Sequence, residues 1–189
     1  MDDIVTMDEA VINAVNSVIS KLYKFLEIPI RLSDLSMPEE DYPYMYYNFI
    51  SAYIPQNELG NHKRIVIAEP GYQKKYIHDI REEHPEMSLS FTACSANRDE
   101  NGTWINGEAE AMQIATKAVG WFSHEGAEAL MFDNLAVVNV SNFTSRSAIL
   151  VDEYVRRWGF DVNIRYKAVT VRVDDVVEKM IICENKFKQ

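Results

Sequence analysis

The chain has 189 residues, of which 47% are hydrophobic and 25% charged, so it holds enough apolar material to fold as one packed domain over residues 1–189. Its 29 acidic and 19 basic residues give a net charge of -10. This excess of negative charge argues against non-specific binding to nucleic acid or to an anionic membrane surface, because both are themselves negatively charged.

Local sequence features indicate a reduced, cytosolic protein without a membrane segment. No apolar run approaches the roughly 20 residues that cross a bilayer. The opening Met1-Asp2-Asp3 is acidic, whereas a signal peptide begins with basic residues. The two cysteines, Cys94 and Cys183, are too few for a disulfide framework.

The first predicted element is an amphipathic helix over residues 7–26, inside an N-terminal helical segment 1–30. Thr6-Met7-Asp8-Glu9 has the spacing of a capping box, which satisfies backbone N–H groups at a helix start. Apolar residues then recur three and four positions apart, which is the period of one helix face. These residues are Val11, Val15, Val18, Leu22 and Phe25. We expect this face to pack on a sheet.

An aromatic strand is predicted from Tyr42 to Ile54, where both faces carry apolar or aromatic residues. Such a strand is either central and covered on both sides, or it presents its second face to another subunit. Aromatic runs also stack single-stranded bases, but that use needs interleaved Lys or Arg, and this segment has neither.

A hairpin and an alternating strand follow. Lys63 to Ile67 predicts one strand, Glu69 to Tyr72 a turn, and residues 73–80 the returning strand, although their pairing stays open. Pro85 indicates an edge or a bulge. From Met87 to Cys94 apolar and small polar residues alternate, which predicts a strand with one face on the core.

The second predicted helix covers residues 108–124. The preceding segment 97–107 is polar and contains two Asn-Gly pairs, so we expect a loop there. Acidic residues at Glu108 and Glu110 suit the positive end of a helix dipole. Gly126 is expected to be the C-cap of this helix.

The last third predicts strands again, at residues 135–140 and 149–167. Beyond Lys167 the apolar residues change parity, which indicates a bulge or turn near Ala168, because a shift by one residue moves every side chain to the other face. A final strand is expected at 176–183, followed by a frayed tail at 184–189. The whole pattern predicts an α+β fold with a mainly antiparallel sheet, and residues 38–183 form the sheet with its central helix.

No residue pattern predicts a catalytic, metal or cofactor site. His78 and His84 are six positions apart, and neither a strand nor a helix brings both to one zinc ion. Ser123-His124-Glu125 has the residue types of a triad, but neighbours on a helix point about 100° apart. A small enzyme without a recognisable motif, or a host interaction module, remains the alternative to a structural role.

Five residues are candidates for an oligomer interface. The last third is locally basic, whereas acidic residues cluster at Glu39-Glu40-Asp41 and Glu82-Glu83, so copies of the chain could pack head to tail. The basic residues are Arg156, Arg157, Arg165, Lys167 and Arg172. The candidate interface comprises Arg156 and Arg157 together with the aromatic residues Tyr44, Tyr46 and Tyr47.

The order of these elements resembles the phage neck and tail-terminator proteins. Leu35-Ser36-Met37-Pro38 followed by Tyr42-Pro43-Tyr44-Met45 is similar to the family's proline and buried-strand start. Residues 88–95 resemble its strand before the central helix, which would lie at 109–122. Residues 154–166 resemble its closing segment, and the resemblance covers roughly residues 38–177.

This resemblance implies a structural protein of the virion, without a catalytic site or a cofactor. Such proteins form a ring, commonly a hexamer, at the head-proximal end of the tail tube. They stop tube polymerisation and offer a surface to the head–tail connector. The implied partners are therefore other copies, the tail tube protein and the neck proteins, in the virion and in the host cytoplasm during assembly. An acidic lumen would let DNA pass without specific binding.

Overall fold

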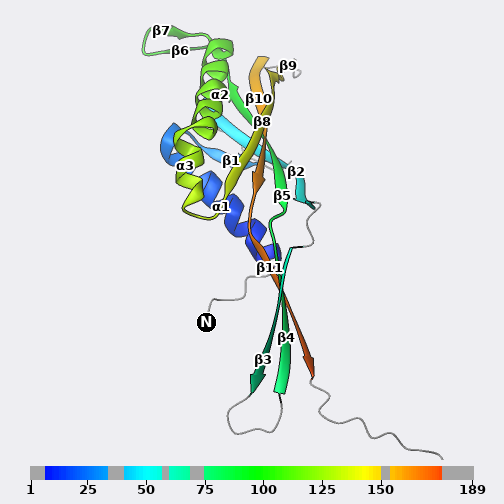
Figure 1. Cartoon of the computed structure of the whole chain (residues 1–189). Helices are drawn as coiled ribbons and strands as arrows, with labels where there is room; N and C mark the ends of the chain where they lie inside the picture. The colour runs from blue at the N-terminus through cyan, green and yellow to red at the C-terminus, as the bar shows by residue number, and fades with distance from the viewer. Residues whose placement is uncertain (1–6, 34–40, 57–59, 69–74, 150–153, 176–189) are drawn as a thin grey trace, which may run out of the picture.

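A computed structural model describes residues 7–33, 41–56, 60–68, 75–149 and 154–175 of the chain. Figure 1 shows helices on one side of a twisted sheet, which together we call the body, and a narrow arm of strands that extends away from it. Thr6 of the expected capping box, the expected strand at 176–183 and the tail at 184–189 lie outside the described residues.

The body sheet has the strand order β1-β2-β5-β10-β8, with the short β9 also paired to β10. Neighbouring strands are antiparallel apart from β1 and β2, which are parallel. The prediction of an α+β fold with a mainly antiparallel sheet is therefore confirmed. The strands are β1 (Ile30–Leu32), β2 (Tyr44–Ile54), β5 (Glu86–Ser95), β8 (Ala136–Ser145), β9 (Ala148–Ile149) and β10 (Tyr154–Arg165).

The two predicted helices are confirmed as α1 (Met7–Leu26) and α2 (Gly107–Ser123). The side chain of Asn106 caps α2 by accepting from the backbone N–H groups of Glu108 and Ala109, at 3.0 and 3.2 Å. Alanines along the buried side of α2 let it approach the sheet closely, where it contacts β5, β8 and β10.

The prediction that Gly126 caps α2 is wrong. Gly126 lies inside a further short helix, α3 (Glu125–Met131), and the C-cap of α2 is His124. A Cβ atom at Gly126 would lie 2.3 Å from the Trp121 ring. Glycine is therefore required here because α3 presses against an indole, rather than because a helix ends.

The core lies between the helices and the inward face of the body sheet. Its centre is aromatic: the Phe91 ring of β5 stacks on Phe160 of β10 at 5.5 Å, and Phe122 of α2 contacts both. Apolar residues of α1 such as Val18 and Leu22 complete it and are fully buried. The apolar residues of the helix stripe thus pack against the inward-facing residues of the alternating strands in one layer.

The arm is a three-stranded antiparallel sheet with the order β11-β4-β3. Its strands are β3 (Asn61–Ala68), β4 (Lys75–Glu83) and β11 (Ala168–Asp175). Strand β4 leads into β5 and β10 leads into β11, so the arm continues the central strand pair of the body (Figure 1). The pairing of β3 with β4 confirms the hairpin, and the parity change occurs between Arg165 and Ala168.

Pro85 lies at the junction of body and arm, where its carbonyl accepts from the backbone N–H of Tyr166 at 3.0 Å. The pair Arg165–Glu86 ends the body ladder, and Ala168–Glu83 begins that of the arm. Proline suits this position because the local backbone interrupts the regular pairing between two ladders.

Two further expectations need correction. Residues 97–107 were expected to form a loop, but they contain a small hairpin of β6 (Arg98–Glu100) and β7 (Thr103–Ile105), which turns at Asn101 and Gly102. Strand β5 was expected to bury one face, yet nine of its ten residues are buried and only Ser90 is half-buried. The cover on its polar face comes from residues far away in the sequence.

Candidate assembly surface

The face of the body sheet opposite the helices carries three of the five candidate residues. On β2, Tyr44 and Tyr46 point away from the helices, because the alternating residue Met45 lies in the core. The strand register aligns Tyr44 with Cys94 of β5, and Cys94 with Arg157 of β10. We call this side of the sheet the open face, since α1, α2 and α3 all lie on the other side (Figure 1).

The row Tyr44–Cys94–Arg157 carries one charge at neutral pH. Burial raises the pKa of the Tyr44 phenol far above its ordinary value of 10.0, so the phenol stays protonated. Burial also raises the pKa of the Cys94 thiol to about 11, although Arg157 opposes this shift. The thiol is therefore neutral and unreactive, and Arg157 supplies the charge of this part of the open face.

A polar network covers the middle of the open face. The guanidinium of Arg146 lies over Gly159 and donates to the hydroxyls of Ser90 and Thr92, at 2.6 and 3.0 Å, and to Asp161 at 2.9 Å. Burial raises the pKa of Asp161, but hydrogen bonds from its neighbours, Arg146 among them, outweigh burial and lower it overall. This network explains why β5 is buried on both faces.

Sequence reasoning missed Arg146. The residue lies in the short connection between β8 and β9, and nothing in Ser145-Arg146-Ser147 indicates that its side chain crosses the sheet. Gly159 was the available signal, because a glycine inside a strand often marks a close approach of another group. A Cβ atom at that position would lie 2.6 Å from the Arg146 guanidinium.

The structure places the other two candidates, Tyr47 and Arg156, on the helix-covered face. Tyr47 packs against the core and its ring contacts Phe91 at 6.1 Å. Arg156 lies 3.5 Å from the Glu108 carboxylate of α2. Consecutive strand residues point to opposite faces of a sheet. Tyr46 and Tyr47 therefore lie on different faces, and so do Arg156 and Arg157.

The basic residues of the last third do not form a free basic surface. Arg165 lies 2.8 Å from Glu86, and Lys167 lies 2.9 Å from Glu82. Arg172 is aligned with Asp79 on the neighbouring strand. Carboxylates of the same chain therefore offset most of this positive charge. The residues that the open face can offer to a partner are its tyrosine side chains and Arg157.

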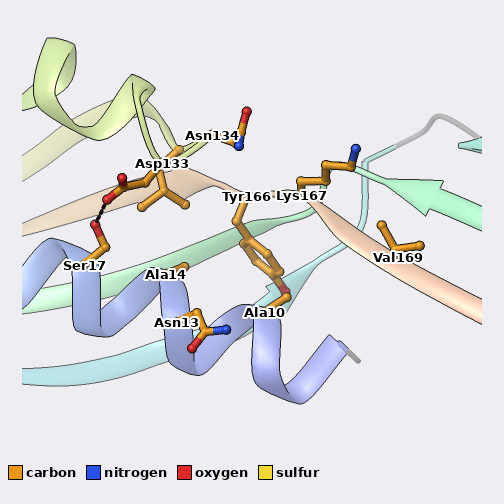
Figure 2. A pocket seen from close by; sticks show the side chains of 10 residues that line it. Ala10, Asn13, Ala14, Ser17, Asp133, Asn134, Tyr166, Lys167 and Val169 are labelled. Atoms are coloured by element: carbon orange, nitrogen blue, oxygen red, sulfur yellow. Dashed lines mark hydrogen bonds between the residues drawn. The ribbon is translucent and has the colours of Figure 1, made fainter. Parts of the chain in front are cut away.

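A pocket of about 490 Å³ lies where α1 faces the root of the arm. Figure 2 shows Asp133 directed toward Ser17 across its rim, with the Tyr166 ring in the middle. Hydrogen bonds from Lys21 and from Ser17 lower the pKa of Asp133, which is therefore a carboxylate tied to its neighbours. The Ser17 hydroxyl and the Lys21 ammonium both donate to this carboxylate, and no histidine is among the described lining residues.

The histidines are not gathered into a site. His62 lies on β3 at 3.2 Å from Asp79, and His78 lies on the arm strand β4. His84 follows β4 at 3.8 Å from Glu82, and His124 separates α2 from α3. Among the described residues, no group of three or more His, Cys, Asp or Glu side chains is arranged to hold a metal ion. None of the helices in the described part of the chain has the length and apolar character of a membrane-spanning segment.

Comparison with known proteins gives one informative match. A search of curated proteins finds nothing similar to this chain. The family model of phage neck terminator proteins matches residues 9–187, nearly the whole length. That match spans both body and arm, and it agrees with the resemblance drawn from the element order. The chain belongs to the family of phage neck terminator proteins.

Proposed function

We propose that copies of this protein form a closed ring, a hexamer, that caps the head-proximal end of the tail tube, stops its polymerisation and joins it to the head–tail connector. Family membership makes the protein a structural component of the phage neck. The ring, its size and its place on the tube are the proposed part. Each copy binds the next through a heterologous contact, in which two different surfaces meet. The ring closes when a whole number of such rotations makes one full turn.

The observation that carries this proposal is the open face. A sheet covered by helices on one side leaves its other side to solvent or to another protein. Here that side presents Tyr44, Tyr46 and Arg157, and tyrosine and arginine are enriched at the centres of protein interfaces. Tyr44 also stacks with Tyr42 at 5.6 Å, which extends the aromatic surface. We propose this surface as part of the contact between copies.

The charge of the chain supports passage of DNA through such a ring. With a net charge of -10, each copy repels phosphate groups, so a ring lets DNA pass without specific binding. The proposed protein partners are the tail tube protein and the connector, in the virion and in the host cytoplasm during assembly. The proposed role is structural and requires neither a catalytic group nor a cofactor.

The test is the mass and shape of the purified protein, alone and mixed with tail tubes, by light scattering and negative-stain microscopy. Wild-type protein should form rings alone or on tube ends. The double variant Tyr46→Ala, Arg157→Ala should assemble at least about tenfold more weakly, because central aromatic and arginine contacts carry much of an interface. A single asymmetric copy at the tube end, or none, contradicts the proposal.

Tyr23→Ala is the matched control. Tyr23 is an exposed tyrosine on α1, on the helix side of the body, with 53% of its surface accessible. Its removal should leave assembly unchanged. If it weakens assembly as much as the double variant does, the open face is not the specific contact.

A further inference from the structure

The small hairpin of β6 and β7 presents an exposed tryptophan beside an acidic side chain. The strand register aligns Asp99 with Trp104, so both side chains lie on one face of the hairpin. Trp104 is 68% exposed, and Asp99 is exposed as well. Tryptophan is among the residues that contribute most of the affinity at the centre of protein interfaces. This face of the hairpin is therefore a candidate contact surface.

The other face of the hairpin is fixed to α2. Arg98 donates to the two oxygens of the Glu110 carboxylate, at 2.7 and 3.1 Å. The Asn97 side chain accepts from the backbone N–H of Gly107, the first residue of α2, at 2.9 Å. Because these bonds position the hairpin before a partner arrives, a contact through Trp104 requires little further ordering of the chain.

The hairpin and the open face lie on different sides of the body. Figure 1 shows the hairpin projecting beside the start of α2, on the helix side and at the end of the body away from the arm. The open face is the other side of the sheet, where Tyr44 and Arg157 share a row. A ring with heterologous contacts needs two separate surfaces on each copy, one for each neighbour. The hairpin is placed to supply the second of them.

We infer that the β6–β7 hairpin of one copy binds the open face of the next, with Trp104 against Tyr44 and Asp99 paired with Arg157. This inference rests on the proposed ring and names the second surface of its contact. The indole ring packs on the phenol, and its face is also open to the Arg157 guanidinium, because cations bind to the faces of aromatic rings.

Charge complementarity identifies a second copy as the partner. The row Tyr44–Cys94–Arg157 carries one positive charge, and no carboxylate of the described residues forms an ion pair with Arg157, whose Nε has no hydrogen-bond partner among them. Asp99 likewise forms no ion pair in the described part of the chain, and it accepts from the backbone N–H of Gly102 at 2.9 Å. The hairpin thus fits a surface that offers an unpaired guanidinium beside aromatic rings, and the open face offers both.

The first test removes one surface at a time. Trp104→Ala removes the hairpin contact and Arg157→Glu blocks the open face, so each variant alone should form rings at least about tenfold more weakly. A mixture of the two should give dimers, since each variant retains the surface that the other lacks. Phe132→Ala is the matched control, because Phe132 is an aromatic residue at the end of α3 with 88% exposure. Its removal should leave assembly unchanged.

A charge exchange tests whether the partner is another copy. Asp99→Arg alone and Arg157→Glu alone each bring like charges together, and each should weaken assembly at least about tenfold. The chain with both changes should assemble within about threefold of the wild type, because every junction again joins opposite charges. Asp99→Asn keeps the oxygen that accepts from Gly102, and it should also weaken assembly while the turn stays folded.

Quenching of tryptophan fluorescence by iodide gives a readout on the unaltered chain. Iodide should quench Trp104 in dilute, unassembled protein and should no longer reach it in rings, whereas Trp121 is 5% exposed in either state. Normal rings from Trp104→Ala, no recovery in the exchanged chain, or quenching that persists in rings overturns the hairpin contact and leaves the proposed ring standing. Absence of wild-type rings with and without tubes overturns both.

Discussion

The edges of the arm differ from the edges of the body sheet, although both are outer strands of antiparallel sheets. β3 carries His62, Lys63 and Arg64, and β11 carries Arg172, whereas in the body β1 carries Arg31 and β8 carries no charge. Charged residues on an edge discourage pairing with another chain. Both edges of the arm therefore carry protecting charges, whereas the β8 edge of the body carries none.

The two regions differ also in what holds them together. The body buries a stack of phenylalanine rings between its helices and its sheet, whereas the arm is a single layer of strands with no helix packed on it among the described residues. In the arm, the row Lys63–Ile80–Val171 and the row Ile65–His78–Val173 each include a polar residue. The arm thus depends for its order on strands that continue from the body.

The largest expected effect is in the body core. Phe91→Ala should lower the free energy of unfolding by about 3–5 kcal/mol, because it leaves a cavity between two stacked rings. Val171→Ala on the half-buried face of the arm should cost about 1 kcal/mol. Denaturant titrations followed by circular dichroism would measure both. Equal losses would contradict the difference between the two regions.

The next effect concerns the polar network of the open face. Gly159→Ala should lower the free energy of unfolding by about 1–3 kcal/mol, because the new methyl group displaces the Arg146 guanidinium from its partners. The control is Gly120→Ala on α2, where no atom lies within 4 Å of the added group. That change should stabilise the helix by about 0.5–1 kcal/mol, as alanine does in a helix interior.

A smaller effect depends on pH. The hydrogen bond from Arg98 holds the pKa of the Glu110 carboxyl below its ordinary value of 4.5. The folded pKa is the lower one, so this pair stabilises the fold above pH 4.5 and the contribution disappears as the pH falls through the folded pKa. The free energy of unfolding from urea titrations should fall less steeply between pH 7 and pH 3 for Glu110→Gln than for the wild type, by under about 1 kcal/mol.

Glu128→Gln provides the comparison for that measurement. Glu128 is an exposed glutamate on α3, and its replacement should leave the slope of stability against pH unchanged. A slope altered equally by both variants would show that general charge, rather than the Arg98–Glu110 pair, causes the acid dependence.

The smallest effect on stability is expected at the arm edge. Lys63→Val should change the free energy of unfolding by less than about 0.5 kcal/mol, because Lys63 is exposed. It should nevertheless increase self-association measured by light scattering at low salt, since it removes a protecting charge from β3. Lys24→Val, at an exposed site on α1, should not have this effect.

Most of the secondary structure could be predicted from local patterns. The stripe from Val11 to Phe25 predicted α1, and the parity change near Ala168 marks the division between β10 and β11. The 97–107 segment was misjudged because two Asn-Gly pairs indicate turns without showing that β6 and β7 pair across one of them. Gly126 was misjudged because its requirement comes from Trp121, a contact with another helix.

The candidate surface was predictable only in part. An aromatic strand without charge pointed to Tyr44 and Tyr46, and the structure places both on the open face, with Tyr44 in the same row as Arg157. Tyr47 and Arg156 lie on the other face. Arg146 was not predicted as part of the open face, because a side chain that reaches across neighbouring strands leaves no periodic signal in the sequence. The ion pairs of Arg165 and Lys167 likewise depend on strand register.

Residue period, composition and element order are properties of the sequence, and they suffice for the α+β class, the two long helices, the alternation of the strands and the resemblance to phage neck proteins. Which strands form edges, how the arm continues the body and which side chains share the open face follow from the folded arrangement, because strand pairing and register join residues far apart in the chain. A strand such as β8 has the same local pattern at an edge or in the centre of a sheet.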